Sequence, residues 1–182
     1  MSTEEFQSFG KIKRLFRDCI ITEKIDGTNA QIYINDSGNI MAGSRNRWLT
    51  PETDNFGFAG WVRDNQTELL KLGPGRHFGE WWGSGIQRKY GLDHKRFSLF
   101  NVNKWWNNPE KPGCCSVVPI LYRGEFCTQT IQGILEEFSA TGSLAAPGFP
   151  DPEGIVILHC HSNQLFKVTL DGDGHKGLRD TE

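Results

Sequence analysis

The chain has 182 residues, which is enough for one domain with a hydrophobic core of its own. Its formal net charge is −2, which argues against a strongly basic nucleic-acid coat protein, and no apolar run reaches the length of a membrane-spanning helix. The five cysteines lack a disulfide-framework spacing and predict reduced thiols in a cytoplasmic protein. The 21 glycines favour a strand-rich α+β domain over a helical bundle.

A short strand and a tight turn are the first elements expected after a polar, basic lead. Residues 19–21 are apolar and predict a buried strand, and the Asp-Gly pair at 26–27 predicts a turn. Residues 30–34 alternate between apolar and polar side chains, which predicts a second strand. This order holds Lys24 at a strand end between acidic residues. Such a lysine becomes a nucleophile once burial or a neighbouring cation lowers its ordinary pKa of about 10.4. The simpler interpretation is a solvated lysine beside an ordinary turn.

A hairpin and a helix are expected next. Turn residues 35–39 lie between two apolar runs and predict a β-hairpin, whose return strand should bring Arg45 close to Lys24 or Asn29. Apolar residues at roughly helical spacing over residues 54–72 predict an amphipathic helix that covers a sheet.

The middle of the chain carries two further expected strands. The first bears Glu80 and leads into a glycine-rich loop that ends at Gly91, and a carboxylate at a strand end can accept hydrogen bonds from a ribose diol. The second spans residues 96–102. Its Phe97 and Phe100 are candidates to stack on a base, and ordinary core packing is an equally supported role for either.

Four elements follow a loop over residues 103–116. They are a strand at 117–122, a helix at 128–138, a strand after Glu153 and a strand at 164–170 that carries Lys167. The His-Cys-His run at 159–161 lacks a second ligand pair, so we expect a polar turn there and not a zinc site.

Several of these segments match motifs of a known enzyme family. Residues 24–29, Lys-Ile-Asp-Gly-Thr-Asn, resemble the KxDGxN motif of covalent nucleotidyltransferases, a superfamily of ATP-dependent DNA and RNA ligases and GTP-using mRNA capping enzymes. Residues 77–91 resemble the FGE…GIQ…YG element of phage-type RNA ligases, which DNA ligases and capping enzymes lack. Ser44-Arg45, Glu153-Gly154 and residues 164–170 also match family motifs. The chain thus resembles phage-type ATP-dependent RNA ligases over roughly residues 8–170.

The resemblance implies a fold and a setting. The implied fold is the α+β nucleotidyltransferase fold, the ligase adenylation domain, with antiparallel sheets around a nucleotide cleft and flanking helices. We expect residues 1–182 to form one such domain with no C-terminal accessory domain. The resemblance also implies a cytoplasmic protein of a bacterium or a phage-infected host cell, with no membrane partner. The oligomeric state stays open.

The resemblance further implies a reaction and its residues. Lys24 would attack the α-phosphate of ATP to form lysyl-AMP, and AMP would then pass to an RNA 5′-phosphate so that a 3′-hydroxyl can seal the strand, in a nicked duplex or a single strand. Mg²⁺ or Mn²⁺ would be placed with the help of Glu153. The other residues assigned to the nucleotide are Glu23, Asp26, Asn29, Arg45, Glu80, Phe97, Phe100, Glu153 and Lys167.

One departure from the family pattern leaves alternatives open. The family's last motif usually carries two lysines flanking one residue, and here the second position is Thr169; Lys176 lies farther along. This substitution favours a second interpretation, a turnover-deficient module that binds a nucleotide or an RNA end. Guanylylation, as in capping enzymes, is a third and weaker interpretation.

Overall fold

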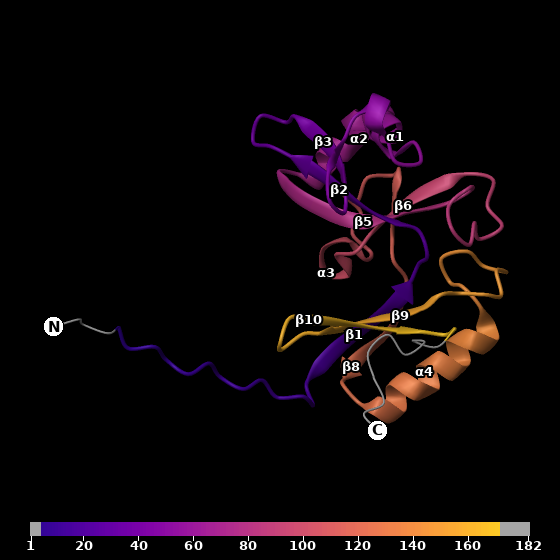
Figure 1. The fold of residues 1–182 in the computed structure, drawn as a ribbon. Coiled ribbons are helices and arrows are strands. Elements are labelled where there is room, and N and C mark those ends of the chain that lie inside the picture. The colour runs from indigo at the N-terminus through magenta and orange to yellow at the C-terminus, as the bar shows by residue number, and fades with distance from the viewer. Residues whose placement is uncertain (1–4, 172–182) are drawn as a thin grey trace, which may run out of the picture.

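The computed structural model describes residues 5–171, which form two β-sheets with helices on their outer sides and one short helix between them (Figure 1). The four-stranded sheet has the order β10-β9-β1-β8, and the six-stranded sheet has the order β4-β3-β2-β5-β6-β7. Neighbouring strands are antiparallel except for β6 and β7, which are parallel. The expected α+β class with antiparallel sheets is therefore confirmed. No helix within residues 5–171 is long and apolar enough to span a bilayer.

The four-stranded sheet packs one face against the longest helix of the described chain. Its core includes Ile21, Ile131, Phe138, Ile155 and Ile157, which interleave strand and helix side chains. The elements are β1 (Asp18–Lys24), β8 (Ile120–Glu125), α4 (Thr128–Thr141), β9 (Gly154–His159) and β10 (Gln164–Thr169). The expected strand at 19–21, the helix at 128–138 and the last two strands are confirmed.

The six-stranded sheet lies on the other side of β1 in Figure 1 and is covered by two short helices. Phe58, Val62 and Leu69 of these helices pack against strand residues such as Ile32 and Trp81. The elements are β2 (Thr28–Ile34), β3 (Ile40–Ser44), β4 (Trp48–Leu49), α1 (Phe58–Asp64), α2 (Gln66–Leu69), β5 (Gly75–Gly83), β6 (Lys95–Leu99), α3 (Val102–Trp105) and β7 (Cys115–Val117). Short 3₁₀ turns span Pro51–Thr53 and Leu70–Leu72.

The hairpin expected at residues 35–39 is confirmed between β2 and β3. The side-chain oxygen of Asn35 accepts hydrogen bonds from the backbone N–H groups of Ser37 and Asn39, at 3.0 and 2.8 Å. Gly38 adopts a φ of 80°, which an L side chain rarely tolerates. The loop thus closes on its own polar groups and sets the β2–β3 register.

The single helix expected over residues 54–72 is wrong, because the segment is broken into short pieces. Asp54 accepts hydrogen bonds from Ala59 N and Gly60 N at 2.7 and 3.0 Å, and Gly57 has a φ of 82°, so the helix begins only at Phe58. It ends where the Asn65 side chain donates to the Trp61 carbonyl at 2.8 Å. Local side-chain bonds of this kind compete with helix continuation.

The strand expected at residues 117–122 is two strands in two different sheets. Pro119 separates them because it has no N–H to donate to a neighbouring strand. Just before it, Val118 N still donates to Leu99 O of β6 at 3.1 Å, whereas the Pro119 carbonyl accepts from Glu23 N of β1 at 2.9 Å. The strand expected at 96–102 is also shorter, since β6 ends at Leu99 and α3 begins three residues later.

Gly27 allows β1 to pass into β2 against the neighbouring strand. A Cβ there would lie 2.5 Å from the Trp81 carbonyl oxygen and 2.8 Å from Trp82 Cβ. We expect Gly27→Ala to lower the free energy of unfolding by about 1–3 kcal/mol, measured by urea denaturation, because backbone must shift. The control Gly133→Ala has open space around it in α4 and should stabilise the protein by about 0.5–1 kcal/mol. Equal, small effects of the two changes would contradict this account.

Candidate active site

A cavity of about 320 Å³ is lined by residues of both sheets. The predicted residues that line it are Glu23, Lys24, Asn29, Arg45, Glu80, Phe100 and Lys167. A second hollow of about 330 Å³ adjoins it, because it shares four of these residues, and it adds Asp26 and Gly27 to the lining. Side chains from distant parts of the sequence thus meet around one space.

Lys24 lines both hollows and forms an ion pair with Glu153, which is not itself among the lining residues. Pairing of β1 with β9 places Lys24 opposite Gly154, so the side chain of the preceding Glu153 meets the lysine ammonium through its Oε1. Both side chains are largely buried, with 23% and 17% of their surface exposed. The other carboxylate oxygen of Glu153, Oε2, is buried and has no hydrogen-bond partner within residues 5–171. A buried carboxylate oxygen without a partner is well suited to receive a cation.

Asn29, Glu80 and Arg45 form a hydrogen-bonded chain on the opposite wall. Asn29 lies directly across from Glu80 in the β2–β5 register, and its side-chain amide donates to Glu80 Oε2 at 3.2 Å. The return strand of the hairpin delivers Arg45, whose Nε donates to Asn29 Oδ1 at 2.9 Å. The expected proximity of Arg45 to Asn29 is therefore confirmed.

The carboxyl group of Glu80 has an unusual acidity. Burial raises its pKa to about 7 from 4.5, and the negative charge of Glu153 adds to the rise, whereas the Lys24 charge and the Asn29 hydrogen bond oppose it. A carboxyl with a pKa near 7 both donates and accepts hydrogen bonds at neutral pH. It can thus match either hydroxyl of a ribose diol.

The raised pKa of Glu80 predicts a pH-dependent stability of the nucleotide-free protein. Ionisation is harder in the folded than in the unfolded state, so stability is lost as pH rises from the unfolded pKa through about 7. Glu80→Gln removes this loss and should stabilise the protein by about 1–3 kcal/mol at about pH 8, with little gain at about pH 4. Thermal unfolding across this range measures the effect, with the exposed Glu110→Gln as control. A gain in stability that is the same at every pH would contradict the raised pKa of Glu80.

The structure separates the two phenylalanine candidates for base stacking. Phe100 lines the cavity and is 40% exposed. Phe97 is fully buried, and its ring packs against Phe58 and Trp61 in the core under the helices. The assignment of Phe97 to the nucleotide is therefore wrong, because β-strand alternation turns its side chain to the other face of the sheet.

Glu23 borders the cavity, but its carboxylate is already engaged. It accepts hydrogen bonds from Ser143 Oγ at 2.5 Å and from the N–H groups of Leu144 and Ala145 at 2.9 and 2.8 Å. Burial raises its pKa, and these three hydrogen bonds act against the rise. Its carboxylate therefore anchors the loop before β9, and because the residue is only 1% exposed, its contact with a nucleotide stays a prediction.

Asp26 is held by Arg88, a residue that the sequence did not single out. The guanidinium of Arg88 lies 3.3 Å from Asp26 Oδ2 and 2.6 Å from Asp151 Oδ2, and it also pairs with Asp171. The backbone N–H of Asp26 donates to the Tyr90 hydroxyl at 2.7 Å. The only signal in the sequence was the position of Arg88 in the basic glycine-rich loop. Arg88 thus joins Asp26, which lines the second hollow, to the segments just before β9 and just after β10.

Lys167 and Thr169 lie on β10, next to the strand that follows Glu153. Lys167 is exposed, lines the cavity and pairs with Val156. Thr169 pairs with Gly154, immediately beyond Glu153. Lys176, the other candidate for the second motif lysine, lies outside the described residues.

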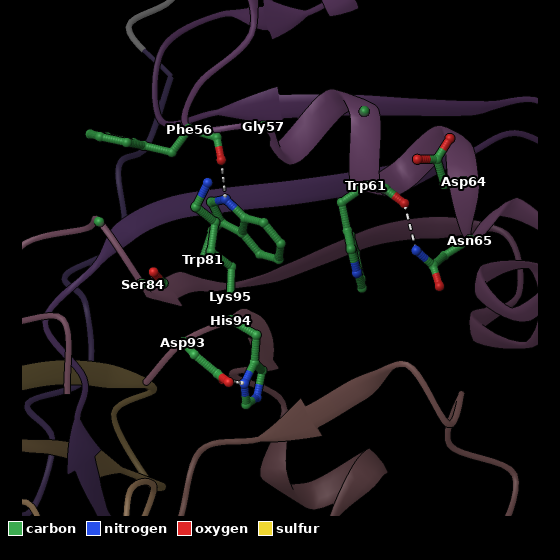
Figure 2. A pocket seen from close by; sticks show the side chains of 12 residues that line it. Phe56, Gly57, Trp61, Asp64, Asn65, Trp81, Ser84, Asp93, His94 and Lys95 are labelled. Carbon is green, nitrogen blue, oxygen red and sulfur yellow. Dashed lines mark hydrogen bonds and ion pairs between the residues drawn. The ribbon is translucent and has the colours of Figure 1, made fainter. Parts of the chain in front are cut away.

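A further hollow of about 680 Å³ lies on the helix-covered side of the six-stranded sheet (Figure 2). Its lining includes Trp61, Lys95 and Trp81, and Figure 2 shows the Trp81 indole N–H donating to the Phe56 carbonyl, at 3.1 Å. Trp81 follows Glu80 on β5, so the two side chains project to opposite faces of the sheet. This hollow is thus separate from the cavity around Lys24.

Comparisons with known proteins bear on the family and the fold. The family model described as RNA ligase matches residues 17–169. A Naegleria gruberi RNA ligase, in a mutant form without ligand, has a TM-score of 0.61 and 20% identity. Two mutants of a Naegleria gruberi RNA ligase, one with AMP and Mn and one with ATP and Mn, each have a TM-score of 0.59 and 22% identity. No curated protein matches the sequence.

The extent of these matches defines what is shared. Each of the three alignments covers 84% of this chain and 48–49% of the Naegleria chain, so the present chain spans about half the length of those proteins. The shared part is the fold with two antiparallel sheets, which is the nucleotidyltransferase fold of ATP-dependent RNA ligases. Because the family model covers most of the sequence, the chain belongs to the RNA ligase family.

Proposed function

We propose that this protein is an ATP-dependent RNA ligase that works through a lysyl-AMP intermediate on Lys24. The Nζ atom attacks the α-phosphate of ATP, a phosphorus–nitrogen bond forms, and pyrophosphate leaves. AMP then passes to the 5′-phosphate of RNA, and a 3′-hydroxyl displaces AMP as the phosphodiester forms. The observation that supports this most directly is the position of Lys24, paired with Glu153, in one cavity with Glu80 and Arg45.

The cavity offers separate positions for the parts of a nucleotide. Phe100 and neighbouring apolar residues provide a surface for the base, and the carboxyl group of Glu80 suits the ribose hydroxyls. Arg45 and Lys167 enter from different sheets and supply positive charge for phosphate oxygens. Transfer of a nucleotidyl group depends mainly on such positioning and charge neutralisation.

The residues around Lys24 fit a divalent cation of the kind found with the Naegleria enzymes. Glu153 Oε2 is buried without a hydrogen-bond partner among the described residues, and Mg²⁺ or Mn²⁺ commonly binds one or two carboxylates together with substrate phosphates. Glu153 is therefore the residue that would hold the cation. Bound there, the cation would neutralise negative charge on the phosphates.

The proton on Lys24 also has a defined contact. An amine attacks only in its unprotonated form, and the ammonium of Lys24 meets Glu153 Oε1. Glu153 is placed to take this proton while β1 keeps the amine aimed into the cavity. The ion pair with Glu153 restricts where the amine can lie, which helps to position it for attack on a bound phosphate.

A second candidate function is a binding module of the same fold that has lost turnover. The observation that favours it is Thr169 at the position where the family usually has a second lysine, beside the strand that follows Glu153. Such a module would bind ATP or an RNA end without releasing pyrophosphate.

Intact mass spectrometry after incubation with ATP and Mg²⁺ or Mn²⁺ tests the proposal. The expected result is a gain of one AMP per protein, with release of pyrophosphate. Competition between ATP and GTP in the same assay separates adenylylation from guanylylation. Folded protein that is free of pre-bound AMP and still gains no mass would overturn the proposal, and ATP binding in that sample would support the binding module.

A further inference from the structure

The uncovered face of the six-stranded sheet continues outward from the cavity. Asn29 and Glu80 face each other across β2 and β5, and the next pairs on the same face are Gln31 with Phe78 and then Tyr33 with Arg76. The intervening residues project to the other face and are buried under the helices. The strands that hold the proposed nucleotide therefore also carry a second set of side chains.

These side chains form an open, aromatic surface, which we call the sheet platform. Phe78 is 52% exposed, and Met41 and Trp48 are 42% and 40% exposed. A soluble protein has little reason to leave several large apolar side chains together in water unless something binds them. The sheet platform consists of Gln31, Tyr33, Met41, Trp48, Arg76 and Phe78.

The platform is ordered by its own contacts. A Cβ on Gly43 would lie 3.1 Å from the Trp48 ring, so the missing side chain lets the indole lie close against the sheet. The Trp48 and Tyr33 ring centroids are 6.1 Å apart, and the Arg76 guanidinium lies 4.9 Å from the Tyr33 centroid and 5.3 Å from that of Trp48. Arg76 also donates to Gln31 Oε1 at 3.0 Å. The rings and the cation are thus held in place before any partner binds.

The charge of the platform selects an anionic partner. None of its six residues is acidic, and the exposed Arg45 and Arg47 lie on the chain just before Trp48. Exposed aromatic rings beside arginines suit unpaired bases and phosphates, because bases stack on rings while the cations meet the backbone. Base-paired RNA keeps its bases stacked inside the helix and offers no free ring faces.

We propose that the sheet platform binds unpaired nucleotides of the RNA strand adjacent to the end that reacts at Lys24. This inference rests on the proposed function, since it extends the same site. Arg76 lies four residues from Glu80 on β5, about 13 Å at the rise of a strand, so the platform begins within a few nucleotides of the cavity.

Binding of a 5′-phosphorylated, single-stranded oligoribonucleotide, followed by fluorescence anisotropy, tests this inference. Trp48→Ala and Phe78→Ala should each weaken binding by about 5- to 100-fold, the range found when one stacking ring is removed. Trp48→Phe keeps a ring face and should retain most of the affinity. Arg76→Gln should lower the slope of log affinity against log salt by about 0.7. The matched control is Trp106→Ala, since this tryptophan is 41% exposed but lies outside the platform.

The same variants separate the two proposals. Each platform variant should still gain AMP from ATP, which also shows that it is folded. Wild-type binding that Trp48→Ala and Phe78→Ala leave unchanged would overturn the platform whatever the AMP result. Absence of AMP transfer in a wild type whose RNA binding these variants weaken would overturn the proposed function and leave the platform as an RNA-binding surface only. A change in oligomeric state on Trp48→Ala, with RNA affinity unchanged, would assign the face to protein contacts and also overturn the inference.

Discussion

Lys24→Ala is expected to abolish the covalent AMP adduct completely. The amine is the bond-forming atom, and the ion pair with Glu153 holds it in the cavity. A charge-conserving variant, Lys24→Arg, should fail as well, because a guanidinium stays protonated at any usable pH. Intact mass after incubation with ATP and a divalent cation measures the loss. Competition by ATP in a binding assay shows whether the variant still holds the nucleotide.

The control for this experiment is Lys71→Ala. Lys71 is exposed and pairs with Glu68 on the helical side of the six-stranded sheet, so its loss should leave adduct formation unchanged. A Lys24→Ala protein that still gained AMP would show that another residue is the nucleophile. Loss of the adduct in the Lys71→Ala protein would show that the assay reports folding.

Arg88→Ala should have the second-largest effect. Its side chain is only 16% exposed, and its removal leaves Asp26, Asp151 and Asp171 without their shared cation. The aspartates at 151 and 171 are mostly exposed, so solvent weakens the penalty, and we expect a loss of about 1–3 kcal/mol in the free energy of unfolding. The rate of AMP transfer should fall about 10- to 100-fold, because Asp26 follows the nucleophile by two residues.

Two further variants separate the effect of the shape of the Arg88 side chain from the effect of its charge. Arg88→Lys keeps the charge but loses the planar fork that reaches several carboxylates, so its rate should lie between the wild type and Arg88→Ala. The exposed neighbour Lys89→Ala should leave both stability and rate unchanged. A wild-type rate in folded Arg88→Ala would contradict a positioning role for this residue.

The site was predictable where the motif and its local structure coincide. A buried β-branched run, an Asp-Gly turn and an alternating strand indicate where Lys24 lies without any tertiary information. The β-hairpin signal likewise predicted that Arg45 returns close to Lys24 or Asn29. In both cases short-range backbone chemistry decides the outcome, and the structure agrees.

Other features depend on contacts between distant segments, which no local pattern encodes. Pro119 divides one apolar run between two sheets, and only the sheet assembly shows which strand each half joins. Phe97 and Phe100 are the same residue type three positions apart, and only the assembled sheets show that Phe97 of β6 is core while Phe100, just after β6, lines the cavity. Arg88 acquires its role because Asp151 and Asp171, more than 60 residues away along the chain, fold back beside it.

The path of the chain through the two sheets has a mechanical consequence. Lys24 ends a strand of one sheet, and Glu80 belongs to the other, while two short stretches, residues 25–27 and 118–119, carry the chain between the sheets beside the cavity. A rotation of one sheet relative to the other would therefore change the separation between the amine and the ribose of a bound nucleotide. The ion pairs of Arg88 join the loop after β5 to Asp26 and to the segments beside β9 and β10, so they oppose such a rotation.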